Sequence, residues 1–117
     1  MLTLQQLYDI SLDLAIKRSP RPLKEMQEQL KKIKDEHSKL DAKKREYFDE
    51  ESLKNPFLDS RIESGDPKTK LKRILVGIDI GVGEILLAHE LSKPVAMGGK
   101  GMKIDAVIAH HPEGRAL

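Results

Sequence analysis

Two short apolar runs in the second half of the chain limit the folds open to it. The first covers residues 73–79 (Arg-Ile-Leu-Val-Gly-Ile-Asp) and the second covers 103–109 (Lys-Ile-Asp-Ala-Val-Ile-Ala). Runs of this length and composition suit the strands of a parallel sheet, which is covered on both faces. Residues 82–91 between them have helical character, with a glycine-rich turn before them and Pro94 after them. The sequence therefore predicts a strand, a helix and a second, parallel strand.

This β-α-β unit is unfinished as it stands. Two parallel strands and one helix leave both sheet edges open and one sheet face bare, and such small parallel sheets rarely stand alone. We expect either that the chain is a fragment of a larger α/β domain or that a second copy pairs with an open edge, and the fragment is the preferred interpretation. The expected fold class is α/β, with a helical, coiled-coil-like segment followed by the partial parallel unit.

The first half of the chain has a helical pattern and many charges. Thr3 and Gln6 have capping-box spacing, so a short amphipathic helix should follow and should stop before Pro20. Beyond it, apolar residues recur with the heptad period of a coiled-coil seam. We therefore predict one long helix that begins at Leu23, ends at Ser52 and packs against a partner helix, in a helical hairpin within the chain or with a second chain. The seam residues are Leu23, Met26, Leu30, Ile33 and Leu40.

The two halves differ in composition, and a turn-rich segment separates them. Ser-Gly-Asp-Pro at 64–67 combines residues that interrupt helices and strands. We therefore place the domain boundary there, with a helical segment over residues 1–63 and the β-α-β unit over residues 64–117.

Composition excludes several classes of function. Among 117 residues, 21 basic and 19 acidic side chains give a formal net charge of +2, which argues against nucleic-acid binding driven by bulk charge. Aromatic residues make up 3% and tryptophan is absent, which also disfavours base stacking. Without cysteine the chain has no disulfide or thiolate zinc site. It lacks a signal-peptide pattern and an apolar run of about 18 residues, so we expect a cytoplasmic protein with no membrane span.

The consecutive histidines His110 and His111 are the residues best suited to chemistry. They follow the second apolar run, and Pro112 biases His111 toward extended geometry. At the carboxyl end of a strand both rings can turn toward one crevice, which is where open α/β sheets bind ligands. Neutral imidazole binds divalent transition metals well. The pair therefore predicts a metal site, with one ring on each of two ions or both rings on one ion.

Two carboxylates accompany the histidines, and each has two interpretations. Glu113 follows directly and is either a ligand or water-activating base, or a solvated loop residue. Asp79 ends the preceding strand, and parallel neighbours lie about 4.8 Å apart, so its carboxylate could lie beside the imidazoles. The preferred interpretation, however, is that Asp79 caps the helix that begins near Val82. The sequence leaves these alternatives open.

Phosphate-binding loops are poorly matched. A dinucleotide fingerprint beginning at Gly81 has Leu86 at its third glycine position, and Lys100 lacks the hydroxyl residue that follows the lysine of a phosphate loop. A basic cluster before the first strand could attract a phosphate-bearing ligand, although such runs are more often solvated. The cluster comprises Lys68, Lys70, Lys72 and Arg73.

Residues 73–79, the following helix and the run that ends in His-His-Pro at 110–112 resemble the N-terminal core of the YbgI-like dinuclear-metal family. Its members are called GTP cyclohydrolase I type 2 homologues or NGG-interacting factor three-like proteins. The resemblance covers residues 72–112. It implies an α/β fold, a homo-oligomeric ring, and two divalent ions (Zn, Fe, Mn, Ni or Co) with His110 and His111 as ligands. The implied activity is metal-dependent hydrolysis.

The chain also departs from that family. The family takes further ligands from a later aspartate and from a distant histidine with a glutamate four residues on, and residues 1–117 contain no counterpart. Its N-terminal Trp-Asp-Asn pattern is replaced here by the charged heptad segment. That segment supports the alternative function, a non-catalytic coiled-coil interaction or assembly protein with an α/β scaffold.

Overall fold

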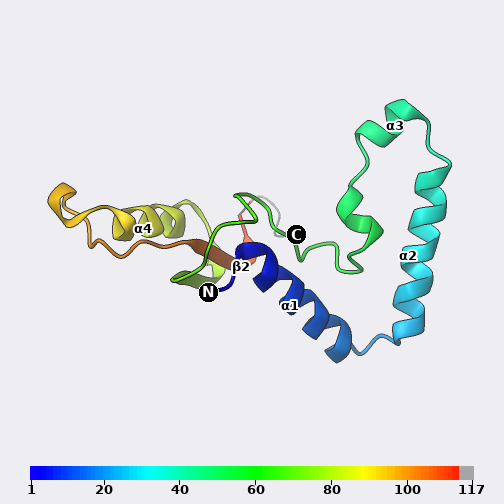
Figure 1. The fold of residues 1–117 in the computed structure, drawn as a ribbon, viewed down its shortest axis with the longest axis horizontal. Helices are drawn as coiled ribbons and strands as arrows, with labels where there is room; N and C mark the ends of the chain where they lie inside the picture. Colours follow the sequence, from blue (N-terminus) through cyan, green and yellow to red (C-terminus); the bar gives the residue numbers. More distant parts are fainter. Residues whose placement is uncertain (114–117) are drawn as a thin grey trace. The chain divides into compact units, whose positions relative to one another are not determined.

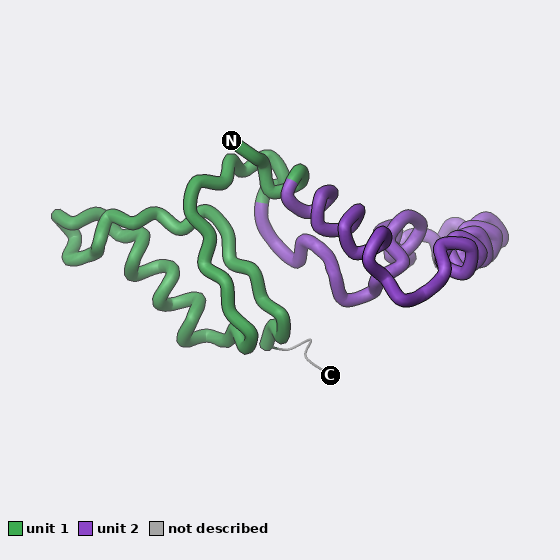
Figure 2. The backbone as a smooth tube through the Cα atoms, turned by 90° about the horizontal axis from the view of Figure 1, so that it is seen from below, with its two compact units in different colours: residues 1–6, 66–117 green, residues 7–65 purple. Residues whose placement is uncertain are grey.

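The computed structural model describes residues 1–113. The chain forms two compact units, which Figure 2 distinguishes by colour. Unit 1 contains residues 1–6 and the chain from Asp66 onward, and unit 2 contains Leu7–Gly65. Unit 2 is therefore inserted, in sequence, between two parts of unit 1. The return to unit 1 lies close to the predicted boundary before residue 64, but the first six residues belong with the β-α-β part.

Backbone hydrogen bonds explain why residues 1–6 belong to unit 1. Thr3 forms an antiparallel bridge with Lys70, and the Leu71 N–H donates to the Leu2 carbonyl at 2.8 Å. Helix α1 (Leu4–Arg18) begins directly after this bridge. The Thr3 N–H donates to Gln6 Oε1 at 2.9 Å and the Gln6 N–H donates to Thr3 Oγ1 at 3.2 Å. The predicted capping box is confirmed.

Unit 2 contains three short helical elements where one long helix was predicted from Leu23 to Ser52. They are α2 (Leu23–Ser38), α3 (Ala42–Glu46) and the 3-10 helix η1 (Glu50–Leu53), shown in Figure 1. The prediction of a single helix is wrong because the helix ends at Ser38 and a new helix begins after Asp41. The Leu40 N–H bonds three residues back to the His37 carbonyl, and the Asp41 carboxylate then accepts the Lys44 N–H at 2.8 Å. An aspartate cap starts a new helix.

A buried polar cluster joins α1 to the segment after η1 within unit 2. The Asn55 side chain is 2% exposed, and its amide donates to the Ser60 carbonyl at 2.6 Å and to Tyr8 Oη at 3.0 Å. Its Oδ1 accepts the Phe57 N–H at 2.8 Å. The Tyr8 hydroxyl donates to the Glu51 carboxylate. Burial, and then the Glu51 carboxylate, raise the pKa of Tyr8 above its ordinary value.

Unit 1 contains the predicted strand, helix and parallel strand. Strand β1 (Ile74–Ile80) leads into α4 (Val82–Ser92), the 3-10 helix η2 (Val95–Met97) and strand β2 (Ala106–Pro112). The two strands are parallel, with Ile74 opposite Ala106 and Ile80 opposite Pro112. The prediction of a parallel β-α-β arrangement is confirmed.

Strand β2 begins and ends three residues later than predicted. Asp105 lies before it, and the Asp105 side chain bonds to the backbone at the start of β1. Its Oδ2 accepts the N–H groups of Lys72 and Arg73, both at 2.9 Å, and its own N–H donates to the Arg73 carbonyl at 2.8 Å. These bonds fasten the start of β2 to the start of β1. The regular pairing then continues through His111 and Pro112.

The apolar core of unit 1 is small. Leu71, Ile80 and Ala88 are buried, whereas Val76 and Ile78 on β1 are 68% and 66% exposed. Because alternate strand residues share a face, these two side chains lie on the same face of the sheet. β1 is therefore not covered on both faces along its whole length, contrary to what its composition predicts, and the bare surface expected for so small a unit is present at Val76 and Ile78.

The hydrogen bonds from the Lys72 and Arg73 N–H groups to the Asp105 carboxylate, which we call the Asp105 clasp, make the stability of unit 1 sensitive to acid. Hydrogen bonds from the Arg73 and Lys72 N–H groups hold the pKa of Asp105 below its ordinary value. A lowered folded-state pKa stabilises the fold at neutral pH, and this contribution is lost below about pH 4, as the pH falls through the folded pKa. We expect Asp105→Asn to melt at a lower temperature than the unaltered protein at neutral pH, with a smaller difference in acid.

Circular dichroism melts over this pH range measure the effect. Asp59→Asn removes the same charge from an exposed position of unit 2 and serves as the control. If the two variants have the same pH profile, the Asp105 clasp makes no specific contribution.

Candidate metal centre

The sequence-predicted site residues meet at the carboxyl ends of the two strands. Asp79 lies opposite His111 in the strand register, and the Glu113 N–H donates to the Ile80 carbonyl at 2.9 Å. Helix α4 begins beside them at Val82. Because the strands are parallel, their carboxyl ends lie at one edge of the unit, which is where open α/β sheets bind ligands.

His111 is paired with Asp79. Its Nδ1 lies 3.0 Å from Asp79 Oδ1, and the His111 and Asp79 side chains are 52% and 86% exposed. A carboxylate only accepts hydrogen bonds, so this contact favours the tautomer with hydrogen on Nδ1 and leaves the lone pair of Nε2 available. The contact therefore fixes the orientation of the imidazole ring.

The two histidine rings are stacked. Their centroids lie 4.4 Å apart and their planes are inclined by 28°. Successive side chains leave a strand on opposite faces, so both rings must turn to meet in this way. Strand β2 has a neighbour on one side only among residues 1–113, which leaves its outer edge open for that movement.

Two glutamates cap the start of α4. Glu84 Oε2 accepts the Gly81 N–H at 2.8 Å, and Glu113 Oε2 accepts the Val82 N–H at 3.1 Å. The hydrogen bond from Gly81 lowers the pKa of Glu84. A Cβ atom at Gly81 would lie 2.7 Å from Glu113 Oε2, so a larger residue there would displace this carboxylate. The capping role that the sequence offered to Asp79 thus belongs to Glu84 and Glu113.

The structure brings some predicted residues together and leaves others apart. His111 contacts both Asp79 and His110, whereas the hydrogen bond of Glu113 is made to the backbone of α4. Within residues 1–113, no three histidine, aspartate or glutamate side chains gather closely enough to hold a metal ion. The hydrogen bond of Glu84 to the Gly81 N–H was not predicted, although a glutamate three residues after a helix cap is a recognisable capping signal.

The chain has no match in the three comparisons with known proteins. No protein-family model, curated protein or solved structure matches it. Among the helices of residues 1–113, none combines the length and the apolar character needed to cross a membrane. The resemblance to the YbgI-like family therefore depends on residues 72–112 alone.

Proposed function

We propose that this protein binds divalent transition-metal ions through His110 and His111, and that it acts as a dinuclear metal-dependent hydrolase. The observation that carries the proposal is the 3.0 Å contact of Asp79 with His111, beside a second imidazole at the carboxyl ends of parallel strands. A carboxylate on the distal nitrogen fixes the tautomer of a histidine ligand and raises its basicity. Asp79 therefore has an orienting role.

The stacked rings favour one ion on each histidine. A metal ion bound by imidazole lies near the plane of the ring, about 2.0–2.1 Å from the nitrogen. The two ring planes are inclined by only 28° and the ring centroids lie 4.4 Å apart, so the planes cross too far from the rings for one ion to lie at bonding distance in both planes. Neighbouring ions in two-metal sites are about 3.5–4 Å apart, which is similar to the separation of the rings.

Hydrolysis would use water activated by the bound metal ions. Glu113 is the proposed base, because it follows β2 directly and its carboxylate is held at the start of α4 by the Val82 N–H. The coordination positions that the histidines do not fill would be taken by water or by a second copy of the chain. We therefore propose a homo-oligomer as the working form.

The Asp79→Asn variant tests the orienting role of this residue. Loss of the carboxylate charge should weaken Zn²⁺ and Co²⁺ binding by about ten- to a hundredfold, the usual effect of removing a group that supports a histidine ligand. Binding should also weaken on acidification, because imidazole ligands must be deprotonated. Isothermal titration of metal-stripped protein measures both effects.

Asp59→Asn is the matched control for this experiment, because it removes the same charge from an exposed position in unit 2. Equal affinities for Asp79→Asn and the unaltered protein would contradict the orienting role.

The alternative function, a coiled-coil interaction protein, has less support. The seam predicted from Leu23 to Ser52 is helical without interruption only as far as Ser38, and Met26 on that seam is 2% exposed. A shorter seam with a buried member offers less surface to a partner helix.

A further inference from the structure

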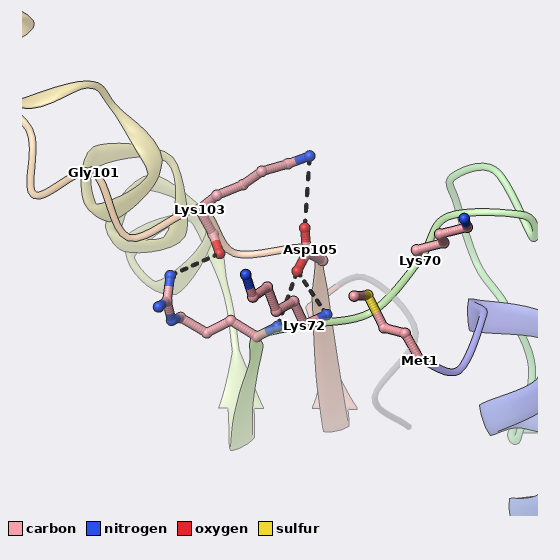
Figure 3. Close-up of a pocket in the computed structure, with 7 residues that line it drawn as sticks. Met1, Lys70, Lys72, Gly101, Lys103 and Asp105 are labelled. Atoms are coloured by element: carbon pink, nitrogen blue, oxygen red, sulfur yellow. Dashed lines mark hydrogen bonds and ion pairs between the residues drawn. The ribbon is translucent and has the colours of Figure 1, made fainter.

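A second group of charged side chains surrounds a cavity at the opposite end of the same sheet. The cavity has a volume of about 440 Å³, which is within the range of small-molecule sites. Figure 3 shows Lys72 and Asp105 where the chain enters the two strands, with Met1, Lys70 and Gly101 on flanking segments. We call this site the basic pocket, and its charged members are Lys70, Lys72, Arg73, Lys103 and Asp105.

The single carboxylate of the basic pocket is occupied by the backbone. Asp105 Oδ2 accepts the Lys72 and Arg73 N–H groups, and its Oδ1 lies 3.7 Å from Lys103 Nζ. The Asp105 side chain is 7% exposed, whereas that of Lys103 is 81% exposed. The Asp105 carboxylate is therefore directed toward the backbone, whereas the Lys103 ammonium is exposed to solvent.

The cations have few partners within the protein. Neither the Lys70 nor the Lys72 ammonium forms an ion pair within residues 1–113. The Arg73 guanidinium donates one long hydrogen bond, 3.3 Å, to the Lys103 carbonyl, which leaves most of its donors available. Four neighbouring cations around one occupied carboxylate repel one another, and an anion in the cavity would relieve this repulsion.

We propose that the basic pocket binds a small anion that carries two or more linked phosphate groups. Phosphate oxygens accept hydrogen bonds from lysine and arginine, and the cations come from separate segments of the chain, so a single phosphate would reach only some of them. The backbone N–H groups of Lys72 and Arg73 already serve Asp105. Recognition therefore depends on exposed side-chain charge and should weaken strongly as salt is added.

A small anion fits these observations better than a nucleic acid does. The chain has a formal net charge of only +2, 3% aromatic residues and no tryptophan, which disfavours nucleic-acid binding driven by bulk charge or by base stacking. The positive charge of the basic pocket is concentrated around one cavity instead.

The basic pocket is separate from the metal centre, and the inference does not depend on the proposed function. β1 has 7 residues and leads from one site to the other. A strand of that length spans about 20 Å, so the anion and the histidine pair would not touch.

Isothermal titration of the full chain with inorganic triphosphate, and in parallel with ATP, tests the proposal. The protein is first stripped of metal on a chelating resin, because a soluble chelator is itself a polyanion. We expect one triphosphate to bind per chain. The Lys72→Gln Arg73→Gln variant should bind it at least about tenfold more weakly than the unaltered protein does.

Raising the sodium chloride concentration from about 20 to about 200 mM should also weaken triphosphate binding. ATP binding as tightly as triphosphate identifies the phosphates as the recognised group, and tighter ATP binding identifies a nucleotide as the source; both support the proposal.

Two variants serve as controls. Lys31→Gln Lys34→Gln removes the same charge from exposed positions on α2 and should bind triphosphate normally. His110→Ala His111→Ala should also bind it normally, which separates this site from the metal centre. The proposal is overturned if triphosphate does not bind at low salt, if both lysine-containing double variants weaken binding equally, or if a short oligothymidylate binds more tightly than triphosphate.

Discussion

Zn²⁺ and Co²⁺ binding should fall at least about a hundredfold in the His110→Ala His111→Ala variant, because imidazoles are the ligands that suit these ions best at this site. The carboxylates of Asp79 and Glu113 would remain, but one of them orients His111 and the other accepts the Val82 N–H. The His111 side chain is 52% exposed, so its loss should change the free energy of unfolding by no more than about 0.5 kcal/mol. A loss of metal binding could then be attributed to the ligands.

Metal content after dialysis against Co²⁺, together with the visible absorption of the Co²⁺ form, measures this effect. The chain has 4 histidines, so His37→Gln His89→Gln removes the other two and provides the matched control. We expect that control to retain its metal. Undiminished metal content in the His110→Ala His111→Ala variant would refute the proposed function.

Replacement of Asn55 by alanine is expected to lower the free energy of unfolding of unit 2 by about 3 kcal/mol. The substitution removes the donor to the Ser60 carbonyl and the acceptor for the Phe57 N–H. Asn55 is 2% exposed, so water cannot readily replace those bonds. Tyr8 also loses a donor, and its hydroxyl is left with the Glu51 carboxylate.

Urea unfolding followed by far-ultraviolet circular dichroism measures this loss. Gln27→Ala removes a side-chain amide from an exposed position on α2 and should change stability by less than about 0.5 kcal/mol. A change at Asn55 no larger than the change at Gln27 would show that the buried cluster contributes little.

The parts of the fold that depend on local sequence were predictable. The capping box at Thr3 and Gln6 and the parallel strands of unit 1 follow from spacing and composition alone. The prediction of one long helix was wrong because a heptad period indicates which side chains face inward and carries no information on where the helix stops. Asp41, an aspartate able to cap a helix, is the residue in the sequence that marks the interruption.

The candidate site was predictable in its location and less so in its contacts. The proximity of Asp79 to His111 follows from two adjacent parallel strands of similar length. The stacking of the histidine rings and the bond from Val82 to Glu113 depend on tertiary structure that spacing does not specify. Similarly, the basic cluster at 68–73 was visible in the sequence, but Lys103 joins it only because the two strands begin side by side.

The bridge between Thr3 and Lys70 has a consequence for biosynthesis. A ribosome releases residues 1–6 well before the segment that they bond, because all of Leu7–Gly65 lies between them. The nascent helical insertion can fold first and bring the two distant ends closer, which reduces the entropic cost of closing so long a loop. In this vectorial order, the strand that carries Asp79 is made before the strand that carries the histidine pair, so the contact between Asp79 and His111 forms only after β2 has emerged.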